Sequence, residues 1–192
     1  MEGKLPDSPP PAPWQITWPY GYPQAVDSAG SVAAPLLAGF SVTLLGIAIA
    51  SSTDMRWANE AMAVLATAAA VLLFAVQAAF NAKRWMVTPA DLLAWWPRPE
   101  VEPGMEQLHV WQAQHKKEHD KWAAWFRWSY NFGLILLLLG VAVCLVPPPV
   151  GTNSSRWLAC GIAGGTALAE AGWVLLSWRA ERRATKKARD GD

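Results

Sequence analysis

The chain has 192 residues, of which 53% are hydrophobic and 16% charged, with thirteen Trp and a formal net charge of +1. Soluble domains carry about 25% charged residues, so this composition excludes an ordinary soluble domain. Four apolar runs, each close to the length that crosses a bilayer, predict an all-α polytopic membrane protein. They cover residues 32–51, 61–82, 128–146 and 157–178.

Basic residues predict the orientation of these spans. Of the sixteen Lys and Arg residues, only Arg56 and Arg156 lie in the connections after the first and third runs. Because cytoplasmic segments carry the excess of basic residues, we expect both termini and connection 83–127 in the cytoplasm. The basic tail 179–192 should lie against anionic lipid headgroups rather than nucleic acid. The composition is typical of bacteria, which predicts a multi-pass protein of the bacterial inner (cell) membrane.

The chain opens with a Pro-rich segment, residues 1–31, that contains the Pro-rich stretch 9–13. It has no basic region leading into a short apolar core with a cleavage site, so it does not resemble a secretory signal. We expect a disordered or polyproline-like cytoplasmic arm. The first two spans follow in residues 32–82.

The connection 83–127 carries two predicted helices. Thr88 and Pro89 begin a short helix that should lie at the membrane surface. From Met105 onward no Pro or Gly occurs before Gly133, so one long helix should extend the third span into the cytoplasm. Aromatic residues in this connection are the candidates for contact with a protein partner, a neighbouring helix or another subunit: Trp95, Trp96, Trp111, Trp122 and Trp125.

His115 and His119 flank Glu118 in the H-x-x-E-H pattern of inverted zinc peptidases. Two Lys stand between the two His, and the surrounding segment is charged, so a solvated helix face is the favoured interpretation. Incidental metal binding and a metal-dependent enzyme are the weaker alternatives. We therefore expect no metal, no cofactor, no catalytic residue and no enzyme activity.

Residues 128–178 form the last two spans and include Glu170, the only ionisable residue deep within a span. A carboxylate at a helix centre costs about 2.5–3.5 kcal/mol on insertion, so it should face protein or water. Gln77 and Asn131 are its candidate polar partners, since both should lie in the cytoplasmic half of their helices. A proton or cation relay, a vestibule lining, a gating contact and a plain helix-packing hydrogen bond all remain open.

Small residues and cysteines complete the candidates in the membrane. Gly161, Gly165 and Ala169 form a ladder of small residues that favours close helix packing. Cys144 and Cys160 should share a depth, so they form either a disulfide or two unbridged buried thiols. Alanines predict similarly smooth packing in the second span: Ala63, Ala66, Ala70, Ala78 and Ala79.

Residues 36–40, with the sequence Leu-Leu-Ala-Gly-Phe, resemble the Leu-Leu-Ser-Gly-Phe stretch in the first helix of Orai calcium channels. The likeness extends to four spans, cytoplasmic termini and a His-rich start of the third helix. It implies six subunits around a pore lined by the first helix, with Phe40 facing the pore. The family's acidic selectivity residue would fall at Ile47 and its basic section near Val32, and neither charge is present. Calcium selectivity is therefore not implied.

Two functions of different classes remain. The first is a homo-oligomer with pore or ion-channel activity gated from the cytoplasmic side. The second is a non-conducting scaffold or accessory subunit that binds a partner through connection 83–127. For the pore, Ser41 would join the hydroxyl lining, and the main pore-lining candidates are Phe40, Thr43, Leu44, Ile47 and Asp54.

Overall fold

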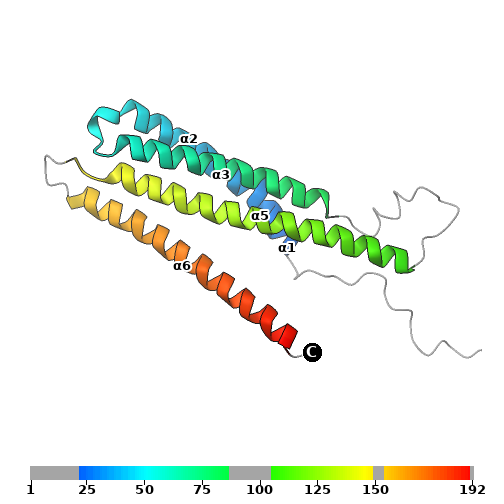
Figure 1. The fold of residues 1–192 in the computed structure, drawn as a ribbon. Coiled ribbons are helices and arrows are strands. Elements are labelled where there is room, and N and C mark those ends of the chain that lie inside the picture. Colours follow the sequence, from blue (N-terminus) through cyan, green and yellow to red (C-terminus); the bar gives the residue numbers. More distant parts are fainter. Residues whose placement is uncertain (1–21, 87–104, 149–153, 191–192) are drawn as a thin grey trace, which may run out of the picture.

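In the computed structural model, the described residues are 22–86, 105–148 and 154–190, and they contain helices and no strand. Each of the four long helices includes a stretch long and apolar enough to cross a membrane. The predicted all-α fold with a long extension of the third helix is therefore confirmed (Figure 1). The helices are α2 (Ala34–Ala50), α3 (Ala58–Arg84), α5 (Met105–Leu145) and α6 (Ser154–Asp190).

The first span begins earlier than the sequence predicted. Helix α1 (Tyr22–Ser28) and the π-helical turn η1 (Ala29–Ala33) run directly into α2, so residues 22–31 are helical rather than part of the expected arm. Tertiary contacts account for the difference, because Val26 and Ala29 pack on a buried cluster that α3 and α5 provide. The rest of the arm lies outside the described residues.

Helices α3 and α5 interlock through two leucines that face two glycines. A Cβ atom added to Gly133 would stand 2.7 Å from Cγ of Leu72, and one added to Gly140 would stand 2.6 Å from Cδ2 of Leu65. Only glycine leaves room for such contacts, as in other close helix pairs in membranes. Leu65 and Leu72 are both fully buried as a result.

The buried side of α3 contains only some of the alanines that we expected to pack. Ala78 and Ala79 are buried, whereas Ala63, Ala66 and Ala70 are exposed. The buried residues recur at steps of three and four, which is the spacing of one helix face. They include Ala61, Leu65, Ala68, Leu72, Ala75, Ala79 and Ala82.

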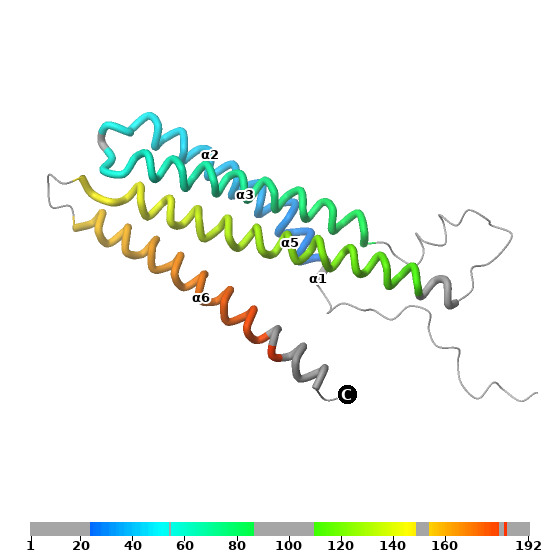
Figure 2. The backbone as a smooth tube through the Cα atoms, in the orientation of Figure 1, coloured from blue at the N-terminus to red at the C-terminus, as the bar shows by residue number. Residues whose placement is uncertain are grey.

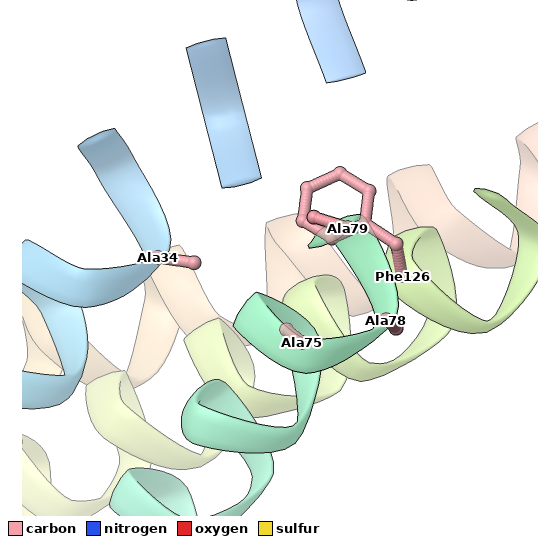
Figure 3. Packing of buried hydrophobic residues seen from close by; sticks show 5 residues of the cluster. All are labelled: Ala34, Ala75, Ala78, Ala79 and Phe126. Atoms are coloured by element: carbon pink, nitrogen blue, oxygen red, sulfur yellow. The ribbon is translucent and has the colours of Figure 1, made fainter. Parts of the chain in front are cut away.

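Two buried clusters hold the bundle together. One joins α2, α3 and α5 through Ala34, Ala75, Ala78, Ala79 and Phe126 (Figure 3). The other lies further along the bundle and contains Ala48, Leu65, Ala68 and Leu137. Gly30 lies against the first cluster, where an added Cβ would overlap the Cβ of Ala79.

The two ends of the bundle differ in charge. We call the end that carries Lys83, Arg84, Arg127 and Arg179 the basic end. The other, the loop end, holds η2 (Ser52–Asp54) between α2 and α3, the end of α5 and the start of α6. At the basic end, Nζ of Lys83 lies 2.9 Å from Oδ1 of Asp27, which links α1 to α3.

Helix α6 packs less closely than the other helices. It lies beside α5 at the loop end and diverges from it toward the basic end (Figure 2). Only 6% of its most apolar stretch is buried, against 39% for α3. Most of the surface of α6 is therefore left for lipid or another molecule.

Replacing Gly30 with Ala should lower the melting temperature of the protein in detergent by several degrees. The new methyl group would overlap Ala79, and overpacking of this kind costs about 1–3 kcal/mol. Gly164→Ala is the matched control, because nothing lies within 4 Å of a Cβ atom there. Equal melting temperatures for the two variants would contradict the close approach of η1 to α3.

Candidate functional site

One side of α2 is exposed along most of its length. Phe40 and Ile47 retain 52% and 51% of their accessible surface, and Thr43 is exposed between them. The Thr43 hydroxyl donates a hydrogen bond to the Gly39 carbonyl oxygen at 3.0 Å. Its proton is therefore satisfied within the helix, while its oxygen can still accept a bond from water.

The other proposed pore-lining residues of α2 are placed differently. Ser41 is fully buried and donates to the Leu37 carbonyl oxygen at 2.9 Å, so it lies on the packed side of the helix. Leu44 is half-buried against the second cluster. Asp54 ends η2, and its side chain lies outside the described part of the chain.

A cleft of about 400 Å³ lies between α5 and α6 toward the basic end. It forms where α6 diverges from α5, and it is bordered by both polar groups and aromatic rings. From α5 come Arg127, Trp128 and Asn131; from α6 come Glu170, Trp173, Val174, Leu175, Ser177 and Trp178. We call this space the α5–α6 cleft.

Glu170 and Asn131 both line the cleft, as their expected pairing requires. They do not bond to each other, and Glu170 has no hydrogen bond or ion pair within the described ranges 22–86, 105–148 and 154–190. Gln77 is exposed on α3 and is not part of the lining. The half-buried carboxyl group of Glu170 thus faces a space that the protein itself does not fill.

Sequence reasoning missed the aromatic and basic residues of this cleft. The rings of Trp128 and Trp178 meet edge to face at 6.5 Å. Arg127 lines the cleft beside them. The sequence contained the information needed to find these residues. Antiparallel helices place the start of the third span, with Arg127 and Trp128, beside the end of the fourth. Trp178 lies at that end, eight residues after Glu170.

His119 is 1% exposed, so the expectation of a solvated helix face is wrong for this residue. Its Nδ1 lies 3.3 Å from Oδ1 of Asp120. Nδ1 of His115 lies 2.9 Å from the Trp111 carbonyl oxygen, and its ring contacts Trp85 at 5.5 Å. Across the described segments, no three His, Cys, Asp or Glu side chains come together to hold a metal.

The aromatic stripe of α5 is divided between the interior and the surface. Trp122 packs on the first buried cluster, and Trp111 is half-buried. Trp125 is 55% exposed and touches the edge of Phe74 at 6.1 Å. Trp95 and Trp96 lie outside the described residues.

The small residues of α6 do not pack within the chain. Gly161 and Gly165 have nothing within 4 Å of an added Cβ, and Ala169 is exposed beside them. The buried small residue of α6 is Ala167 instead, at 1% exposure. The ladder therefore faces away from α5 and is open to lipid or a second protein.

Comparison with models of known protein families, with curated proteins and with solved structures found no significant match to this chain.

Replacing His119 with Ala should destabilise the fold by about 2 kcal/mol or more, because it leaves a cavity in a buried position. Thermal unfolding in detergent would measure the effect, with the exposed neighbour Gln114→Ala as the control. The same loss should appear with and without EDTA. A melting temperature of the unmodified protein that falls in EDTA would show that His119 holds a metal.

Cys144 and Cys160 are free thiols in the structure. The denatured protein should therefore take up two maleimide groups without prior reduction, as measured by intact mass. Labelling of both cysteines that occurs only after reduction would instead establish the disulfide. Single Cys144→Ser and Cys160→Ser variants, each with one adduct, are the controls.

Proposed function

We propose that this integral membrane protein assembles into a symmetric homo-oligomer in which the exposed side of α2 lines an ion-conducting path. The supporting observation is the division of α2 into two sides. Its packed side, with Ala38, Ser41 and Ala48, faces the bundle, while Phe40 and Ile47 point away from it. In a ring of copies, that outer side would meet the central axis.

The composition of the exposed side suits a narrow path. Gly39 and Gly46 have nothing within 4 Å of an added Cβ, so helices from neighbouring copies can approach closely there. Thr43 offers its oxygen to water, and Phe40 would form a hydrophobic constriction that gates by dewetting. The resemblance to Orai channels places Phe40 in the pore by a separate route. Since α2 contains no charged residue, no ion selectivity is proposed for it.

The proposed gate is accessible from the basic end, which we place in the cytoplasm beside anionic lipid headgroups. Phe126 of α5 packs in the same cluster as Ala34, the first residue of α2. Gly30 lies against Ala79 and Phe126 just before α2, within a π-helical turn of a kind often found at functional sites. A shift of the α5 extension would therefore reach α2 through direct contacts. The proposal includes no catalytic step and no cofactor.

Replacing Phe40 with Ser should raise ion leak through proteoliposomes several-fold, because it removes the hydrophobic constriction. Phe80→Ser is the matched control, since Phe80 is also exposed, at 61% against 52% for Phe40, but lies on α3. Dye-based flux at equal protein density would measure both variants. Equal flux in wild type, Phe40→Ser and Phe80→Ser would contradict the pore.

The subunit count separates the pore from its alternative. Native mass spectrometry in lipid discs should show one discrete oligomer of five or six copies. A monomer, or a fixed complex with another protein, would contradict the ring and favour a non-conducting accessory subunit. That alternative is supported by Val110 and Trp125 of α5, which stay 59% and 55% exposed on the extension.

A further inference from the structure

The α5–α6 cleft contains an acid that no neighbour neutralises. Glu170 lies on an apolar stretch of α6, half-buried, and the described residues supply it with neither a hydrogen bond nor an ion pair. A charged carboxylate at such a depth is unfavourable unless a counter-charge accompanies it. The side chain that faces it across the cleft, Asn131, is neutral. A cation that enters the cleft would supply the missing charge.

The walls of the cleft select the kind of cation. Trp128, Trp173 and Trp178 bring three indole rings to the same space as Glu170. The faces of indole rings attract cations, and rings around an acid are the usual way in which proteins hold organic ammonium groups. Mg²⁺ and Ca²⁺ need six or more oxygen ligands, or water in their place. Apart from Arg127 and the indoles, the polar side chains of the lining are Glu170, Asn131 and Ser177.

Size and access fit an organic molecule as well. The volume of about 400 Å³ falls within the range of sites for small organic ligands. Helix α6 diverges from α5 toward the basic end (Figure 1). We infer that the cleft between the two helices is open to the surrounding lipid. A ligand with an apolar body can therefore enter from the lipid with its charge carried to Glu170.

We propose that the α5–α6 cleft is a binding site for a lipophilic organic cation, with Glu170 as the counter-charge and the indoles as the apolar and cation-attracting walls. This site is separate from the proposed pore along α2 and does not depend on it. The proposal gives Glu170, the ionisable residue deep within the membrane spans, a role in binding one class of ligand.

Arg127 favours a different occupant, an anionic lipid headgroup at the mouth of the cleft. A phosphate group deep enough to touch the indoles would approach the Glu170 carboxylate and be repelled by it. Arg127 is exposed, so water and salt screen its repulsion of an incoming cation. Because Glu170 has no counter-charge in the cleft, we favour a cation over an anionic lipid headgroup as the occupant.

Equilibrium dialysis of radiolabelled tetraphenylphosphonium against the full chain in phosphatidylcholine discs tests the site. We expect saturable binding of one probe per chain. Glu170→Gln should weaken it at least tenfold and Trp173→Leu several-fold. Glu60→Gln is the matched control, because Glu60 is an exposed acid in the first turn of α3, outside the cleft, and it should leave binding unchanged.

Three outcomes would overturn the proposal. They are the absence of saturable binding to a chain that elutes as a single species, unchanged binding after Glu170→Gln, and equal loss after Glu60→Gln. A fourth outcome would replace the proposal with an anionic lipid site. In that case phosphatidylglycerol would compete with the probe, and its binding would be lost in Arg127→Gln but kept in Glu170→Gln. None of these readouts involves ion flux, so they remain distinct from the test of the pore.

Discussion

The close approach of α3 and α5 is the constraint on which the rest of the structure depends. Leu65 and Leu72 fit over Gly140 and Gly133, and no larger residue than glycine can stand at either place without moving a leucine. In lipid, such packing replaces the hydrophobic effect as the source of helix association. The contact fixes the rotation of α3, and the rotation of α3 in turn decides which side of α2 is packed and which is exposed.

Helix α6 lies outside this interlock, and its position has consequences for the site. Nothing on α6 matches the leucine and glycine pairs, because no atom lies within 4 Å of a Cβ atom added to any of its glycines. The two helices meet through Ala167 and through the rings of Trp128 and Trp178. The indoles of Trp128 and Trp178 meet between the two helices and line the cleft together with Glu170.

Hydropathy and the absence of helix breakers were enough to predict the four spans and the extension of α5, because both depend only on the local sequence. Rotation about each helix axis was harder. On α3 eleven of the 27 residues are Ala, so composition cannot tell the exposed Ala66 from the buried Ala68. We expected Gln77 beside Glu170 because the two lie at a similar depth in the membrane, yet Gln77 is exposed on α3. Asn131 was placed well because α5 and α6 are neighbours in sequence, and the early start of α1 was missed because tertiary contacts order it.

Two sides of α6 are left uncovered by the rest of the bundle. One side borders the α5–α6 cleft, and the opposite side carries Gly161 and Gly165, which are open for close contact with another helix. A second copy seated on those glycines would press on α6 and set how far it diverges from α5. The volume beside Glu170 would then depend on the neighbour, and by thermodynamic linkage a cation bound there would change the affinity between copies by the same factor. Under the two proposals, ligand binding in the cleft and subunit assembly would be coupled through a single helix that the rest of the bundle holds only weakly.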